Sequence, residues 1–114
     1  MIRELQVTEL AKELADNDKT LTTANIWDVR DESAYLAGHI AGATNQPINA
    51  GIAKQTLDNA QGTVYVLCGG GSKAPRAAAT LEELDNSRDI VILTGGTRGA
   101  KSAGMTIVTG EQPL

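Results

Sequence analysis

The segment that decides the fold is residues 63–74, TVYVLCGGGSKA. Residues 63–67 are rich in β-branched side chains and predict a buried strand. That strand leads directly into Cys68 and three glycines, after which a helix is expected from Ala74 to Leu84. Pro75 is tolerated in the first turn of such a helix, and alanine and leucine residues give the helix an apolar stripe. The segment therefore predicts a strand, a cysteine, a glycine-rich loop and a helix in succession.

The rest of the chain alternates between the same two kinds of element. The patterns predict, in chain order, a helix at 7–15, a strand at 24–29, a helix at 32–37, a strand at 42–45, a helix at 51–59, a strand at 89–93 and a helix at 98–103, followed by a loose C-terminal tail. The strands of near-continuous valine, isoleucine and leucine are typical of a parallel sheet covered on both faces. We therefore expect one α/β domain over residues 1–114, because a chain of this length rarely divides.

Composition excludes several classes of function. The formal net charge of −4 argues against nucleic acid as a partner, since an acidic protein repels phosphate backbones. No apolar run approaches the roughly 18 residues that a transmembrane helix needs, which argues against a membrane partner. The first residues carry no apolar signal-peptide core. The expectation is a cytoplasmic protein whose core is built from leucine, isoleucine, valine and alanine, as phenylalanine is absent.

Cys68 is the single cysteine of the chain, so an internal disulfide is excluded. A lone cysteine is more often a small buried hydrophobe than a catalyst. Its neighbours favour the second role here. Glycines 69–71 can curl into a nest of backbone N–H groups, because glycine adopts positive φ at little cost. The following helix adds unpaired N–H groups and its positive dipole end, and Lys73 adds a full positive charge. All of these favour the nucleophilic thiolate over the thiol.

This arrangement is typical of two-step nucleophilic catalysis. Cys68 would attack the outer sulfur of a donor such as thiosulfate, hold it as an anionic persulfide, and pass it to a thiol or to cyanide. The residues expected to bind the substrate are Gly69, Gly70, Gly71, Ser72, Lys73 and Ala74. The chemistry requires no cofactor.

Three ordered motifs resemble the signatures of the rhodanese family. The first is Asp28-Val29-Arg30 with Tyr35 and the run GHIAGA at 38–43; the second is the strand 64–67 followed by Cys68; the third is LTGG at 93–96 with Gly104. The resemblance extends over most of the chain. It implies the three-layer α/β domain of the family, with a central parallel sheet flanked by helices. It also implies that Cys68 is the persulfide carrier and that the loop 69–73 is the anion cradle.

The chain departs from the family pattern at several positions of the pocket. The family often has arginine where this chain has Lys73 and serine where it has Ala74. Lysine keeps the charge but lacks the planar fork that grips an oxyanion at two points, which affects thiosulfate binding more than nucleophilicity. Ala34 replaces a commonly acidic residue, the usual partner of Arg30. Thr97 and Ala100 replace aromatic residues, which predicts a more open or more polar pocket wall.

Asp28, Arg30 and His39 are expected to support the site. Asp28 and Arg30 lie at a strand end, where they could tune the pocket or form a structural ion pair; we favour the ion pair, because buried charges tend to be paired. His39 is the only histidine. It could act as a general acid or base. We favour a structural role, in which its ring hydrogen-bonds backbone groups and fixes a turn. One cysteine and one histidine are too few for a zinc site, so no metal is expected.

Residues 95–102, GGTRGAKS, come close to a phosphate-binding P-loop. Ala100 stands where that motif needs glycine, and only 12 residues follow Ser102, too few for the remaining strands of such a fold. Nucleotide binding is therefore disfavoured.

Two other functions remain open as alternatives to the sulfurtransferase. The first is a cysteine-dependent phosphatase or arsenate reductase. Phosphatases that share the rhodanese fold have a loop one residue longer, with arginine six positions after the cysteine; here that position is Ala74, and Lys73 is five positions on. The second is a non-enzymatic persulfide relay or sensor that hands sulfur to one protein partner. Activity with small thiols would favour the enzyme, and transfer to a single protein would favour the relay.

Overall fold

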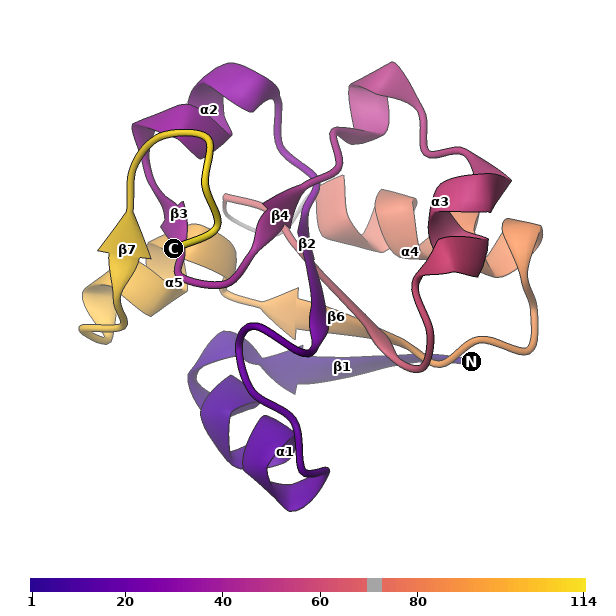
Figure 1. Ribbon diagram of the computed structural model, residues 1–114, viewed down its shortest axis with the longest axis horizontal. Coiled ribbons are helices and arrows are strands. Elements are labelled where there is room, and N and C mark those ends of the chain that lie inside the picture. Colours follow the sequence, from indigo (N-terminus) through magenta and orange to yellow (C-terminus); the bar gives the residue numbers. More distant parts are fainter. Residues whose placement is uncertain (70–72) are drawn as a thin grey trace.

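A computed structural model describes residues 1–69 and 73–114 of the chain. Its centre is a sheet with the strand order β1-β6-β5-β2-β4, in which every neighbouring pair is parallel. The strands are β1 (Ile2–Gln6), β2 (Asn25–Asp28), β4 (Thr44–Asn45), β5 (Val64–Leu67) and β6 (Ile90–Thr94). Figure 1 shows β2 and β6 in the middle of the molecule, with helices on either side. The expected α/β fold with a central parallel sheet is confirmed.

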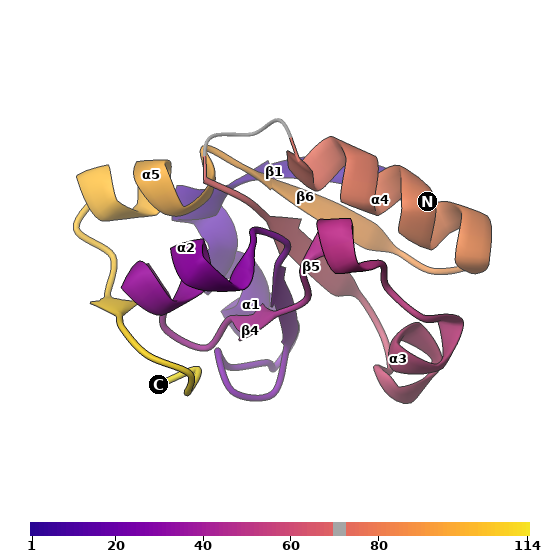
Figure 2. The ribbon, with the colours of Figure 1, turned by 90° about the horizontal axis from the view of Figure 1, so that it is seen from above.

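Helices cover both faces of this sheet. The helices are η1 (Val7–Glu9), a 3-10 turn that continues into α1 (Leu10–Asp16), then α2 (Glu32–Ala37), η2 (Ile48–Ala50), α3 (Lys54–Asn59), α4 (Lys73–Leu84) and α5 (Gly96–Ser102). Buried residues of α3 and α4 share one apolar cluster, and those of α1, α2 and α5 share another. Figure 2 shows α4 and α2 on opposite sides of β5. The molecule therefore has three layers.

The side chains of β5 alternate between the two clusters. Val64 and Val66 pack with α3 and α4, whereas Tyr65 and Leu67 pack with the helices of the other layer. This is the two-residue period of a strand. Cys68 continues the alternation and belongs to the cluster under α4.

The N-terminal strand was not expected from the sequence. β1 forms the edge of the sheet and pairs in register with β6 from Ile2–Ile90 to Gln6–Thr94. Its side chains are exposed or only partly buried, so its sequence lacks the continuous apolar run that marks the inner strands. An edge strand of this kind is held mainly by its backbone ladder, which leaves a weak pattern in the sequence.

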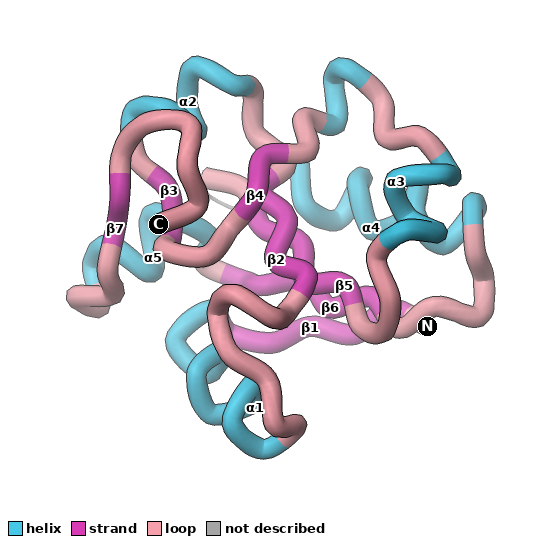
Figure 3. Tube along the Cα trace, in the orientation of Figure 1, coloured by secondary structure: helices cyan, strands magenta, loops and turns pink. Residues whose placement is uncertain are grey.

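The expectation of a loose C-terminal tail was wrong. β7 (Ile107–Val108) pairs antiparallel with β3 (His39–Ile40), and the backbone N–H of Gly42 donates to the carbonyl of Pro113 at 2.9 Å. The pink tube between α5 and the C-terminus in Figure 3 accordingly runs beside the segment that follows α2. Two-residue strands are too short to give a periodic pattern, so neither was predicted.

The expected helices and inner strands lie close to their predicted bounds. The helix at 32–37 is confirmed at both ends, whereas α3 begins three residues later than expected and α5 begins two residues earlier. None of the helices in the described ranges is long and apolar enough to cross a membrane.

Candidate active site

The carboxyl ends of β2, β5 and β6 meet at one edge of the sheet, the position where parallel α/β folds gather reactive groups. Asp28 lies beside Leu67, and Val66 lies beside Ile92, so these three strands end at nearly the same level. The segment after β2 carries Arg30, the segment after β5 carries Cys68, and the segment after β6 carries Thr97.

Cys68 is buried, with 2% of its surface exposed. It packs in the apolar cluster that includes Trp27, Val29 and the alanines at the start of α4. The structure therefore places the cysteine at the predicted strand end, inside the protein rather than on its surface.

The turn between β6 and α5 holds the backbone of this cysteine. The N–H of Thr97 donates to the carbonyl of Cys68 at 2.9 Å, and the N–H of Arg98 donates to the carbonyl of Gly69 at 3.1 Å. Gly96 has a φ of +56°, and a Cβ added to it would lie 2.0 Å from the Cys68 carbonyl oxygen. Only glycine fits such an approach. The two amides bind protein carbonyls, which agrees with the sequence argument that disfavours a P-loop at residues 95–102.

Asp28 and Arg30 form a buried ion pair. The Asp28 side chain is fully buried and that of Arg30 is 15% exposed. Arg30 donates from Nε to Oδ1 at 3.0 Å and from Nη2 to Oδ2 at 2.7 Å, and Nη2 also donates to the carbonyl of Gly38 at 2.6 Å. This is the pair that the sequence favoured. Ala34 does not leave Arg30 without a carboxylate, because Asp28 supplies one from the same strand end.

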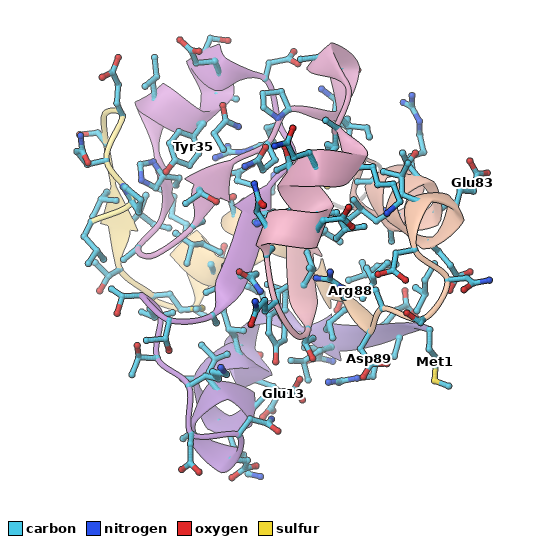
Figure 4. The ribbon with its side chains drawn as sticks, turned by 45° about the vertical axis from the view of Figure 1, so that its right-hand side comes forward. Met1, Glu13, Tyr35, Glu83, Arg88 and Asp89 are labelled. Atoms are coloured by element: carbon cyan, nitrogen blue, oxygen red, sulfur yellow. The ribbon has the colours of Figure 1, made fainter. Side chains whose placement is uncertain are left out.

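His39 is fully buried and its ring stacks on Tyr35 at 3.7 Å between centroids. Its Nδ1 lies 2.9 Å from the Tyr35 carbonyl and its Nε2 lies 2.8 Å from the Gln112 carbonyl. The ring thus connects α2 to the C-terminal segment, as the backbone-anchoring interpretation requires. Tyr35, labelled in Figure 4, donates to the carbonyl of Ala43, and burial raises its pKa.

The predicted cradle is described only in part. Gly70, Gly71 and Ser72 lie outside the described residues. Gly69 is partly buried, and Ala74 is buried in the same apolar cluster as Cys68. Lys73 begins α4, and its Nζ lies 3.7 Å from Oδ2 of Asp31, with the two side chains 33% and 56% exposed. The full positive charge expected from Lys73 is therefore shared with a carboxylate at the surface.

A cavity of about 360 Å³ opens beside Gly69, between α2 and α5. Its lining includes Arg30, Ala34, Gly69, Thr97, Arg98 and Lys101. Sequence reasoning did not select Arg98 and Lys101 as site residues. The available signal was two basic residues three positions apart on the helix that follows the third motif.

Another ionisable network lies between α1 and the strands β1 and β5. Arg3 forms an ion pair with Glu13 and lowers the pKa of that carboxyl. Tyr65 donates to Glu13 at 2.9 Å, and burial together with Glu13 raises the pKa of Tyr65 to about 12. Glu13 is labelled on α1 in Figure 4. These groups fasten β1 and β5 to α1. In the part of the chain that the structure describes, no group of three or more possible metal ligands occurs.

Known proteins share this fold and sequence pattern. The family model of the rhodanese-like domain matches residues 6–103. The rhodanese-like domain of the protein Alr3790 from Anabaena superposes with a TM-score of 0.78 at 24% identity, covering 96% of this chain and 80% of that one. Thiosulfate sulfurtransferase from Pseudomonas aeruginosa gives a TM-score of 0.69 at 22% identity and covers 96% of this chain but 20% of that one.

One curated relative has a name that concerns sulfur. "Putative sulfur carrier protein YrkF" from Bacillus subtilis (strain 168) is 28% identical over 87 residues, which is 76% of this chain. The match covers 45% of that protein, so this chain spans about half the length of the curated relative that it matches.

Proposed function

The chain belongs to the rhodanese-like domain family, and from that premise we propose that it is a sulfurtransferase in which Cys68 carries a sulfane sulfur as a persulfide. The observation that carries the proposal is the place of Cys68. It directly follows the central strand β5, its carbonyl is held by the β6–α5 turn, and a glycine-rich segment leads from it into α4.

Two displacements at sulfur make up the reaction. In the first, the Cys68 thiolate attacks the outer sulfur of thiosulfate; a new S–S bond forms, and sulfite leaves with the electron pair of the broken bond. In the second, an acceptor thiolate attacks the outer sulfur of the persulfide, and the Cys68 thiolate leaves. With cyanide as acceptor the product is thiocyanate. Each step conserves charge and needs neither an external oxidant nor a cofactor.

A protein-to-protein sulfur relay is the second candidate. The name of the Bacillus subtilis relative, which calls that protein a sulfur carrier, favours it. We also propose a cytoplasmic location, where acceptor thiols are kept reduced.

Intact-mass spectrometry tests the carrier role directly. After incubation with thiosulfate or polysulfide, the wild-type protein should gain about 32 Da, one sulfur atom, and a reductant should remove it. Cys68→Ala should gain nothing while keeping the wild-type circular dichroism spectrum. A protein that takes up no sulfur from any donor in a panel with mercaptopyruvate and glutathione persulfide would contradict the proposal.

The same assay separates the remaining functions. Release of the sulfur to cyanide or small thiols within minutes identifies an enzyme, whereas release to a protein acceptor alone identifies a relay. An adduct from an aryl phosphate in place of sulfur would assign the site to phosphoryl transfer.

A further inference from the structure

The cavity beside Gly69 has an unusual charge for this protein. Three of its lining side chains, Arg30, Arg98 and Lys101, are cationic, and no acidic side chain lines it among the described residues. The whole chain has a formal net charge of −4. A cationic hollow in an acidic protein concentrates field lines and attracts anions. The charge of the cavity therefore favours an anionic ligand, which the acidic surface elsewhere would repel.

Two of these cations have no carboxylate of their own in the described part of the chain. Arg30 is neutralised by Asp28, but no ion pair involves Arg98 or Lys101. Carboxylates pair with Arg3, Lys12, Lys54, Lys73 and Arg88. Lys19 and Arg76 also form no ion pair among the described residues, so the distinguishing feature of Arg98 and Lys101 is that both line one cavity with Arg30. Because Arg98 and Lys101 are three positions apart on α5, their side chains lie on the same side of the helix.

Thr97 adds a second, independent sign of an incomplete site. It is 8% exposed and lines the same cavity, and its Oγ1 is a buried atom with no hydrogen-bond partner in ranges 1–69 and 73–114. A buried hydroxyl without a partner is costly, and in native proteins such groups commonly meet a ligand or a water. The backbone N–H of Thr97 donates to the carbonyl of Cys68 at 2.9 Å, so this residue adjoins the proposed sulfur carrier.

We propose that this cavity binds the anionic body of a small thiol acceptor that carries carboxylates, with Arg98 and Lys101 as the residues that select it. The inference rests on the proposed function, because the acceptor receives sulfur from the Cys68 persulfide. A volume of about 360 Å³ lies within the roughly 300–1,000 Å³ of small-molecule sites. It is large enough for a peptide-sized thiol, and Gly69, which lines it, directly follows Cys68 in the chain. The guanidinium of Arg98 matches a carboxylate at two points, and Lys101 serves a second anionic group.

Sulfur transfer from the persulfidated protein tests the selection. The acceptors are glutathione, glutathione diethyl ester, in which both carboxylates are masked, and 2-mercaptoethanol. The double variant Arg98→Gln and Lys101→Gln should lower the second-order rate with glutathione by about tenfold, since two charge-assisted contacts are lost. Rates with the diester and with 2-mercaptoethanol should change by less than about twofold. An equal loss for all three acceptors would overturn the proposal, because the cations would then act on Cys68 or on the fold.

Lys19→Gln is the control for loss of a positive charge outside the cavity. It removes one charge where the double variant removes two, and Lys19 is exposed and lies with Asn25 and Gly62 near the amino ends of β2 and β5, away from the carboxyl ends. Its rates with all three acceptors should equal those of the wild type. Thr97→Val replaces the hydroxyl with a methyl group of the same shape and should lower the glutathione rate about threefold while leaving the 2-mercaptoethanol rate unchanged.

Direct binding separates this inference from the proposed function. S-methylglutathione cannot accept sulfur, so its binding to the wild-type protein reports on the cavity alone. NMR shifts at residues 97–101, lost in the double variant and kept in Lys19→Gln, are expected. Binding without any sulfur uptake at Cys68 would retain the cavity and refute the carrier role. Uptake without binding would refute the cavity, and displacement by inorganic phosphate better than by succinate would refute the preference for carboxylates.

Discussion

Two strand–glycine–helix units lie side by side in this protein, and they use their glycines differently. In the first, β5 leads through Cys68 and a glycine run into α4; in the second, β6 leads through Gly95 and Gly96 into α5. By sequence alone each resembles an anion-binding loop. In the structure, the second unit directs its amides at the carbonyls of Cys68 and Gly69. A glycine-rich turn after a parallel strand therefore binds an anion only if its amides are not already bound by the protein.

The second unit supports the first. Gly96 lets the two backbones come so close that a Cβ would overlap the Cys68 carbonyl oxygen. The hydrogen bonds from Thr97 and Arg98 then fix the cysteine at the end of β5. Because α5 also carries the cations of the cavity, one turn positions both the sulfur carrier and the proposed acceptor site.

Among the substitutions considered, Gly96→Ala should disturb the contact between the β6–α5 turn and Cys68 most. The new Cβ would lie 2.0 Å from backbone, which cannot move as a flexible side chain would, and the residue keeps a left-handed φ. We expect a loss of about 4 kcal/mol in the free energy of unfolding, at the upper end for one substitution. Sulfur uptake at Cys68 should fall with it. Urea denaturation and intact mass give the two readouts.

Gly104→Ala is the control for backbone conformation alone. Gly104 has a φ of +81° and nothing lies within 4 Å of an added Cβ. It should lose about 1 kcal/mol, the cost of a non-glycine residue in the left-handed region, and retain sulfur uptake. If both variants lose the same free energy of unfolding, the need for glycine at position 96 comes from its left-handed φ and not from the close approach to Cys68.

Asp28→Asn tests the carboxyl end of β2, where an ion pair rather than a glycine stabilises the site. The change leaves the largely buried Arg30 guanidinium without its carboxylate, and breaking a buried pair costs about 3 kcal/mol. Thermal or urea unfolding measures it. Asp16→Asn breaks an exposed Lys12 pair instead and should cost less than about 0.5 kcal/mol. Equal effects would mean that the Asp28–Arg30 pair behaves like a surface pair.

The inner sheet and its helices could be predicted from the sequence because burial on both faces leaves a strong pattern. Residues 63–67 and 89–93 read as strands for that reason, and Gly38 marked the end of α2. The edge strand β1 and the short β3–β7 ribbon were missed, because backbone pairing with little side-chain burial imposes no such pattern. The order of motifs was sufficient to identify the family.

The site was predictable at the level of single residues but not at the level of contacts. Cys68 was placed by its strand, and the Asp28–Arg30 pair by the rule that buried charges are paired. The close approach of Gly96 to the Cys68 carbonyl could not be predicted from the sequence, because it depends on two segments 28 residues apart meeting in space. Arg98 and Lys101 were considered only within a run that comes close to a P-loop, and once nucleotide binding was disfavoured neither was selected as a site residue. The pairing of Lys73 with Asp31 was hidden in the same way.

Lys73→Gln measures how much the Lys73 charge, as distinct from the backbone amides of the first unit, activates Cys68. The Lys73 ammonium is partly exposed and lies 3.7 Å from an Asp31 oxygen, so its effect on the Cys68 thiolate is that of a screened surface charge. Alkylation of Cys68 at pH 7 should slow by no more than about fivefold, the equivalent of about 1 kcal/mol. Lys54→Gln, which breaks the exposed pair with Asp58 on α3, is the matched control and should alkylate at the wild-type rate. A fall of a hundredfold in Lys73→Gln alone would show that the ammonium, rather than the backbone, activates the sulfur. If Lys73→Gln alkylates at the same rate as Lys54→Gln, the backbone amides of the loop are the source of activation. The two units would then differ in one respect: the amides of the first would stabilise an anion, whereas those of the second bind protein carbonyls.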